Sequence, residues 1–515
     1  MDNLILYFFL VCFLYIFRIY VIKLHSFHFD DGISGDASGH YTIIKTFKEK
    51  ITSIYVKQFL IKNEGPMSYA VFYHMIASLF SKKTIESRYK INLFFFCIFG
   101  LIYFLLVEHI ISNNLIQYNS SSSFFIIICF FLFITSITNF YSFGTNIAYL
   151  DLGERFLAKI LTSFYYFTLL IFFSSDNDYF ILLSILFSSL SFLTSNFARQ
   201  ALIIPTLFFS FFTFSFVPIL ILFLGLILAI ILQSKRFLRS LKFQYLHLKL
   251  YQKTFAKSEL RKHVLSSFIS KKDLVGFFKN KNLKNLYNVI FKEPIRGILF
   301  IPEIILLFIT YFYTNDKLLN NSIPLFISIY LTYLIVSTKT FNFIGESYRY
   351  IEYTTYFLFP FLLSYIFVND LLPNKEYFFI IYGVYVSIFF ILYLKLLKFQ
   401  KENFSTKYLS DLLENIHFSE TNNILPIPLR LTLDICARTE ANGIWWQPGN
   451  LTENIQNNYL EEYPFPSKDL FSIIKKHNIT HVIVDINSLT KINWEYPFDK
   501  LILIYENETH RVYKV

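Results

Sequence analysis

Long apolar runs constrain this chain more than any other feature of its sequence. A helix needs about 20 apolar residues to cross a bilayer, and runs of that kind recur through the first 400 positions. Of the 515 residues, 54% are hydrophobic and only 16% are charged, whereas soluble domains carry about 25% charged residues. The sequence therefore predicts a polytopic α-helical membrane protein.

The apolar runs predict about 11–13 spans in a membrane domain covering residues 1–399. Residues 3–22 form the first run, and because no small-residue cleavage site follows it, we interpret it as a signal anchor. The later runs are a short one at 67–80 and others at 91–111, 124–142, 156–173, 179–194, 199–214, 216–232, 290–313, 322–338, 353–368 and 377–396.

From residue 400 the pattern changes to that of a small soluble α/β domain, residues 400–515. Residues 467–476 are expected to form a helix that Ser467 caps. Residues 481–485 and 501–505 are typical of buried strands, and 511–515 of a final strand.

The charge distribution predicts a topology. Residues 235–284 carry fourteen Lys or Arg against two acids, so the basic loop, residues 235–285, is expected to be cytoplasmic rather than a nucleic-acid site. Eight spans before it would place the N-terminus inside and the first loop, residues 24–66, outside. Four spans after it would leave the C-terminal domain inside, but a re-entrant helix, for which the run at 290–313 with Pro294 and Pro302 is the candidate, would reverse this. The count therefore leaves the side of the C-terminal domain open.

The first loop holds a cluster of three carboxylates and two imidazoles between His28 and His40, directly after the first span. Charge next to lipid is costly and often marks function. The adjacent Asp30 and Asp31 can hold a divalent cation through oxygen ligands, or one can act as a general base with its pKa raised by the other. A solvated turn has the same Asp, Gly and Ser composition, and residue types alone do not separate these interpretations. Asp36 and His40 are expected to have supporting roles.

Two further sets of charged residues are candidate substrate contacts. Arg155 and Arg199 can hold a lipid diphosphate or reach lipid headgroups as boundary residues. In the second set, two acids and one arginine follow each other at spacings of three residues and so fall near one helix face. They form either a structural ion-pair network or one wall of an anion site. These residues are Glu346, Arg349 and Glu352.

Several kinds of site have no signal in the sequence. It contains no Walker A loop, Rossmann glycine fingerprint, HExxH or GxSxG motif, which argues against ATP-driven transport, soluble-nucleotide chemistry and zinc proteolysis. The four cysteines are isolated and predict neither a disulfide framework nor a zinc site. His74, in the short apolar run at 67–80, is interpreted as a helix-packing residue.

The layout resembles the GT-C superfamily of integral-membrane glycosyltransferases, and most closely its bacterial dolichyl-phosphate-mannose-protein-mannosyltransferase-like branch. The resemblance covers the order of segments along the whole chain but only a few residues. These are Asp30 or Asp31 early in the first loop, Gly65-Pro66-Met67-Ser68-Tyr69 before the next apolar run, and the Arg-Tyr-Glu stretch between Glu346 and Tyr353. The chain has no WWDYG-like signature, and Trp445-Trp446 is followed by Gln-Pro-Gly.

The resemblance implies a polyprenyl-phosphate sugar donor, with its phosphate held by Arg349, Arg155 or Arg199, and an extracytoplasmic acceptor that is a glycan, lipid or protein. Asp30 or Asp31 would deprotonate the acceptor hydroxyl. It also implies a bacterial inner membrane with the active site on the outer face, and an extracytoplasmic C-terminal domain, against the span count. No cofactor is required by this interpretation, although a divalent cation fits the acidic cluster.

Other classes of protein share part of this layout. A polysaccharide polymerase or O-antigen ligase usually has a large late loop, whereas the loops at 314–321 and 369–376 are short. A flippase for lipid-linked oligosaccharides, or another transporter, favours internal repeats and broken helices. A non-catalytic membrane scaffold is the remaining alternative.

Overall fold

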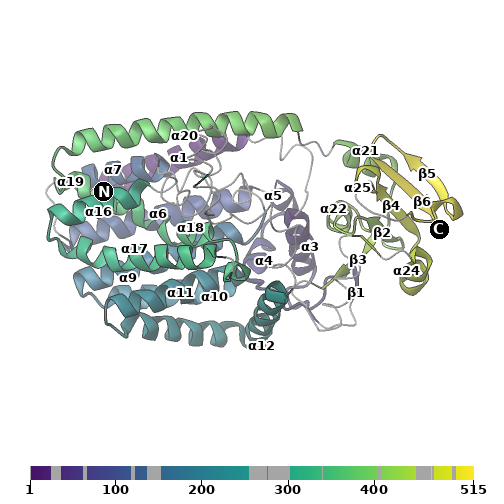
Figure 1. Ribbon diagram of the computed structural model, residues 1–515, viewed down its shortest axis with the longest axis horizontal. Coiled ribbons are helices and arrows are strands. Elements are labelled where there is room, and N and C mark those ends of the chain that lie inside the picture. The colour runs from purple at the N-terminus through teal and green to yellow at the C-terminus, as the bar shows by residue number, and fades with distance from the viewer. Residues whose placement is uncertain are drawn as a thin grey trace.

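A bundle of helices joined to a smaller α/β body at one end makes up the protein (Figure 1). The computed structural model describes residues 2–24, 36–61, 66–87, 89–116, 122–135, 152–253, 275, 302–338, 340–403, 407–447, 465–466, 469–489 and 495–515. Asp30 and Asp31 lie outside these residues.

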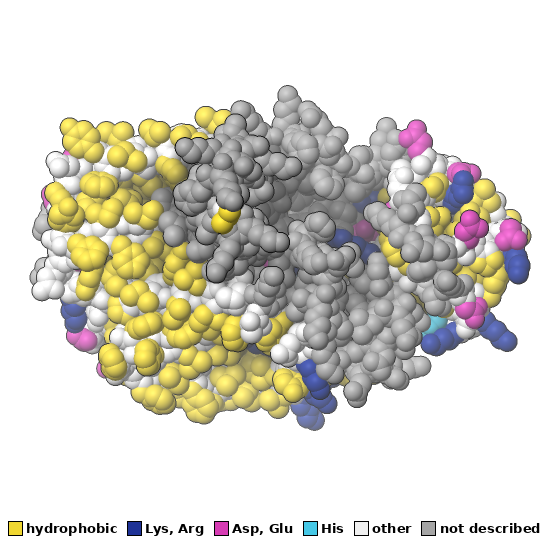
Figure 2. Space-filling model, viewed as in Figure 1, with side chains coloured by type: hydrophobic (Ala, Val, Ile, Leu, Met, Phe, Trp, Pro, Cys, Tyr) yellow, Lys and Arg dark blue, Asp and Glu magenta, His cyan; other side chains and the backbone are white. Residues whose placement is uncertain are grey.

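The helices of the bundle run side by side along its length, with α20 along one edge (Figure 1). Apolar side chains cover the bundle, and charged ones gather on the smaller body (Figure 2). The helices are α1 (Asp2–Leu24), α6 (Lys90–Ser112), α7 (Ser122–Thr135), α9 (Arg155–Ser175), α10 (Tyr179–Thr194), α11 (Asn196–Phe212), α12 (Val217–Lys253), α16 (Pro302–Tyr313), α17 (Lys317–Ser337), α18 (Tyr348–Thr355), α19 (Leu358–Val368) and α20 (Lys375–Asn403).

Within the part of the chain that the structure describes, four helices are long and apolar enough to cross a bilayer, namely those over 90–112, 155–175, 217–249 and 317–337. Helices α18 and α19 make a fifth if they are taken as one span bent by 60°. The run expected at 353–368 is therefore a broken helix. Helix α16 covers Pro302–Tyr313, and the earlier part of the run expected at 290–313 lies outside the described residues.

The apolar run at 67–80 is not a membrane span. It forms α4 (Phe72–Ala77), followed by turns and by α5 (Lys82–Glu86). Six helical residues rise only about 9 Å, far less than the thickness of the hydrocarbon core. Helix α4 instead packs against α3 (Asp36–Glu49) in the first loop.

The C-terminal body is a mixed sheet with short helices. Strands β2 (Asn423–Ile427), β3 (Asn442–Trp446) and β4 (His481–Asp485) are parallel, and β6 (His510–Lys514) and β5 (Ile502–Glu506) continue the sheet antiparallel. Its helices are α21 (Lys407–Asn415), α22 (Leu431–Arg438), α24 (Leu470–His477), α25 (Ile486–Leu489) and the 3-10 turn η5 (Phe498–Lys500).

Two expectations about this body are corrected. Asp469, not Ser467, caps α24, because its carboxylate accepts from the Ser472 N–H at 3.1 Å. Strand β5 is largely exposed rather than buried, because it forms the edge of the sheet.

The sixth strand of the sheet comes from the first loop. Strand β1 (Phe59–Ile61) pairs parallel with β3, and beside it the Gln58 amide donates to the carbonyls of Cys436 and Thr439, both at 2.9 Å. The first loop and the C-terminal body therefore lie on the same side of the membrane, which corrects the span count that separated them. The expected division at residue 400 stays a prediction, since the sheet takes strands from both parts.

The start of the basic loop also lies on that side. Helix α12 kinks at Ser234, and beyond the kink the Arg236 guanidinium donates to the Ile51 carbonyl at 3.2 Å. The expectation that the first loop and the basic loop face opposite sides is therefore wrong. The run at 67–80, which the span count included although it forms only the short helix α4 and turns, is one source of the error.

Close packing of α10 on α12 yields a stability prediction. A Cβ at Gly225 would lie 2.0 Å from Ser188 Oγ and 3.2 Å from the Ile185 carbonyl oxygen. Gly225→Ala should therefore force the two helices apart, at about 1–3 kcal/mol, and lower the melting temperature of the detergent-solubilised protein. Gly383→Ala is the control, because nothing lies within 4 Å of that Cβ and alanine favours a helix. Equal melting temperatures for the two variants would contradict this packing.

Candidate functional site

A cavity of about 300 Å³ lies where the first loop and the kinked end of α12 meet the starts of α9 and α11 and the segment before α18. Its polar lining is drawn from distant parts of the sequence. The lining residues are Tyr69, Glu154, Arg155, Ser195, Asn196, Phe197, Gln200, Phe243, Gln244, His247, Leu248, Phe343, Ile344, Gly345, Glu346 and Arg349.

One wall is the N-terminal end of α9. Glu154 occupies the N-cap position and Arg155 is the first helical residue. The first N–H groups of a helix point outward and carry partial positive charge. Because Arg155 adds a guanidinium to the same wall, this end of the cavity suits an anion such as phosphate.

Arg349 adds a second guanidinium to the cavity lining. Arg349 pairs with Glu346 at 2.5 Å, and the Tyr348 hydroxyl donates to the same carboxylate at 2.6 Å. Arg349 also lies over the Phe197 ring, 5.7 Å from its centroid. Gly345 makes this turn possible, since its φ of +135° is one that other residues rarely adopt.

Arg199 lies behind the cavity wall rather than in it, with 1% of its surface exposed. Its guanidinium donates to the Phe192 carbonyl at 2.7 Å and to Ser240 Oγ at 2.7 Å. It also donates to Asn196 Oδ1 at 3.0 Å and Gln244 Oε1 at 3.3 Å. Because the last two residues line the cavity, Arg199 holds α11 and the end of α12 together at the wall.

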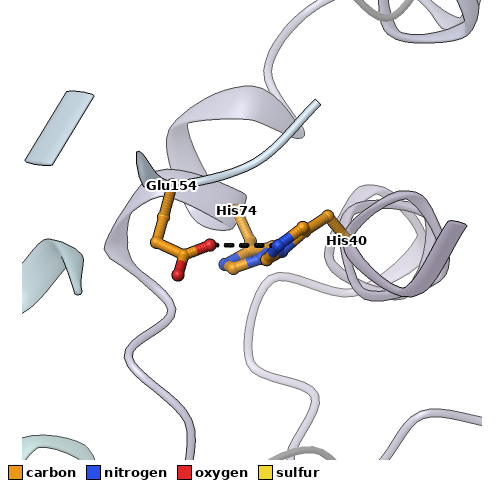
Figure 3. Close-up of side chains that lie close together, drawn as sticks. All are labelled: His40, His74 and Glu154. Atoms are coloured by element: carbon orange, nitrogen blue, oxygen red, sulfur yellow. Dashed lines mark hydrogen bonds and ion pairs between the residues drawn. The ribbon is translucent and has the colours of Figure 1, made fainter. Parts of the chain in front are cut away.

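Glu154, which lines the cavity, also belongs to a polar cluster with His40 and His74 (Figure 3). Its Oε2 lies 3.1 Å from His40 Nε2, and its Oε1 accepts from the Tyr69 hydroxyl at 2.6 Å. His40 Nδ1 lies 2.8 Å from His74 Nε2. Burial, with the nearby His40 as the second cause, holds the pKa of His74 well below its usual range, so this imidazole is neutral at pH 7. Two imidazoles and a carboxylate are a donor set that divalent metals use.

The close approach of His40 to Glu154 depends on Gly153. A Cβ at that position would lie 3.2 Å from His40 Cδ2 and 3.3 Å from its Nε2. Any larger residue there would therefore push the imidazole away from the carboxylate.

The structure brings together some of the site residues expected from the sequence. Arg155, Glu346 and Arg349 line one cavity, and His40 contacts its lining residue Glu154. Glu352 is fully buried one turn further along α18. Asp36 is the first residue of α3. The expected catalytic pair, Asp30 and Asp31, falls outside the described residues.

Sequence reasoning missed other members of the site. Glu154 precedes a span like any boundary acid, Tyr69 is one of 37 tyrosines, and His74 resembled a residue of a membrane helix. Nothing in the sequence around Gly153 and Glu154 indicates that these residues contact His40. Among the lining residues that were missed, Gly345 alone carried a signal in the sequence, because a glycine directly before the charged residues 346–352 indicates a turn.

Solved structures of other proteins share the fold of this chain, whereas its sequence has no match among family models or curated proteins. No family model matches the chain, and no curated protein matches its sequence. The crystal structure of ArnT from Cupriavidus metallidurans bound to undecaprenyl phosphate is similar with a TM-score of 0.51 and 10% identity, covering 97% of each chain. Its apo form is similar with a TM-score of 0.44, 10% identity and the same coverage.

The likeness to the undecaprenyl phosphate-bound structure shows that this chain has the ArnT fold along nearly its whole length. The GT-C-like architecture expected from the sequence is therefore confirmed at the level of the fold. So is the fold class, a polytopic α-helical membrane protein with a small C-terminal α/β domain.

The burial of Arg199 predicts that it stabilises the folded protein rather than binding a ligand. Arg199→Met should lower the free energy of unfolding by at least about 2 kcal/mol, because buried acceptors lose a charged donor. Arg199→Lys should recover part of it. The control Arg511→Met removes a half-exposed ion pair with Glu506, worth about 0–1 kcal/mol. A normal melting temperature for Arg199→Met would contradict the supporting role.

Proposed function

We propose that this protein is an integral-membrane glycosyltransferase that moves a sugar from a polyprenyl-phosphate donor to an extracytoplasmic acceptor, which is a glycan, lipid or protein. The observation that carries the proposal is the cavity that both Arg155 and Arg349 line, in a chain with the fold of ArnT. The ArnT structure binds undecaprenyl phosphate, a ligand whose charged end calls for cationic partners.

The donor phosphate would lie between the two arginines. A guanidinium matches the geometry of phosphate oxygens and can bind two of them at once. In the structure the Arg349 guanidinium forms an ion pair with the Glu346 carboxylate. A phosphate entering the cavity would therefore compete with that carboxylate for the guanidinium. The ion pair with Glu346 holds Arg349 in place before the donor binds and avoids an unpaired buried charge.

The location of the cavity suits a lipid-linked donor. Helices that begin at its walls, α9 and α11, are apolar helices of the bundle, and the first loop and C-terminal body stand on the same side. A polyprenyl chain could therefore stay in the bilayer while its phosphate reaches the cavity. We assign that side to the outside of the plasma membrane of a bacterium, where sugars are supplied on lipids rather than on nucleotides.

The chemistry needs one carboxylate that acts as a base, and we assign it to Asp30 or Asp31. The carboxylate takes the proton of an acceptor hydroxyl, whose oxygen attacks the anomeric carbon with inversion. The bond from that carbon to the phosphate oxygen breaks, and its electron pair leaves with the polyprenyl phosphate. Arg155 and Arg349 stabilise the negative charge that grows on the leaving group.

Removal of one cavity arginine tests the phosphate site. Arg155→Ala and Arg349→Ala should each weaken binding of undecaprenyl phosphate at least about tenfold, since a charged hydrogen-bonded contact is worth about 1.5–3 kcal/mol. Native mass spectrometry of the purified protein measures the bound lipid. Arg511→Ala, on the C-terminal body, is the control and should bind normally. Full binding by both cavity variants would contradict the assignment.

The catalytic carboxylate is tested by isosteric substitution. Asp30→Asn or Asp31→Asn should reduce sugar transfer about 10²-fold or more, the usual contribution of a general base, without loss of membrane insertion or lipid binding. Asp499→Asn, an exposed residue of the C-terminal body, is the control. Full transfer by both single variants and by the double variant would exclude these residues. Movement of an intact lipid-linked sugar across vesicles, with no transfer, would favour a flippase instead.

A further inference from the structure

Three potential metal ligands meet beside the cavity that Glu154 lines, each from a different segment. His40 comes from α3, His74 from α4, and Glu154 from the N-cap of α9 (Figure 3). One ligand atom from each residue lies within 4.8 Å of the others. Ligand atoms about 2.1 Å from a tetrahedral Zn²⁺ are roughly 3.4 Å apart, so small side-chain rotations bring these three onto one ion.

The hydrogen bonding of the cluster is incomplete without a further partner. Glu154 Oε2 and His74 Nδ1 are buried and accept or donate no hydrogen bond in the part of the chain that the structure describes. An unsatisfied buried polar atom costs about 1–3 kcal/mol. Glu154 Oε2 lies only 3.1 Å from His40 Nε2 but outside hydrogen-bond alignment. A cation held between these two atoms would give both of them a partner.

We propose that His40, His74 and Glu154 bind a divalent transition-metal ion of the Zn²⁺ class. Two of the three ligands are imidazole nitrogens, which suit Zn²⁺ and its neighbours in the first transition row, whereas Mg²⁺ and Ca²⁺ prefer oxygen. Three protein ligands leave a fourth position for water or a substrate oxygen. The Tyr69 hydroxyl on Glu154 Oε1 is the outer-shell contact that fixes the carboxylate.

The ion would tie the first loop to the wall of the cavity. Glu154 is next to Arg155 at the start of α9, so fixing the carboxylate also fixes the position of that guanidinium. This site differs from the acidic cluster at Asp30 and Asp31, where the sequence placed a possible cation. It does not depend on the proposed glycosyl transfer.

The competing arrangement is a proton-sharing chain from His74 through His40 to Glu154 with no ion. The two differ in metal content, which can be measured on the purified full-length protein, free of any affinity tag, in detergent. After equilibration with Zn²⁺ and gel filtration, elemental analysis should find about one ion per chain. A strong chelator should remove it and lower the melting temperature.

Variants locate the ion. His40→Ala, His74→Ala and Glu154→Gln should each weaken Zn²⁺ binding more than about 100-fold, and Tyr69→Phe by about 10-fold, as for outer-shell contacts. His109→Ala is the matched control, because His109 is exposed at the C-terminal end of α6, and it should bind normally. If His74→Ala fails to fold, the less buried His40 gives the same test.

Cobalt gives a second readout that is independent of activity. Co²⁺ in place of Zn²⁺ should give a visible absorption band that the three ligand variants lose and His109→Ala keeps. Absence of a stoichiometric ion in the parent protein, or equal binding by all variants, would overturn the proposal and leave the proton-sharing chain. Loss of metal with normal undecaprenyl phosphate binding would support the metal site alone.

Discussion

The site depends on the way the first loop is held between the helical bundle and the C-terminal body. Strand β1 adds to the edge of the sheet at β3. Gln447 accepts from the Val56 N–H at 2.6 Å and donates to the Val56 carbonyl at 3.1 Å. Helix α3 packs on α22, where Ser38 donates to Asp434 at 2.6 Å. These contacts fix the helix that carries His40 relative to the helices that carry the cavity, because a strand pairs in one register once its neighbours are set.

The same contacts decide the sidedness of the molecule. A strand from the first loop can pair with a strand from the C-terminal body only if both are on one side of the bilayer, since an open sheet edge cannot cross lipid. Helix α12 joins this side through its kink, where Arg236 contacts the backbone of the first loop. Arg236, just after the kink, therefore stands next to the first loop.

Two carboxylates of the cavity have partners in the protein itself. Glu346 pairs with Arg349, and Glu154 contacts Tyr69 and His40. A charge near lipid is costly unless it is paired and hydrogen-bonded, so each guanidinium that could hold a phosphate needs such surroundings. Arg199 differs from such guanidinium groups, because its N–H groups already donate hydrogen bonds to residues of α10, α11 and α12. It supports the wall and is poorly placed to bind an anion.

The sequence by itself determined the class of the protein, most of its helices and several strands, because apolar runs and alternating patterns are local properties of the chain. It also selected Arg155, Glu346 and Arg349 by residue type. Only the tertiary structure decided that the run at 67–80 does not span the membrane, that the first loop supplies a strand to the C-terminal sheet, and that His40, His74 and Glu154 meet. Residues 34 to 114 positions apart along the chain have no local pattern that relates them. Their meeting depends on the packing of α3, α4 and α9, which the sequence of any one segment does not contain.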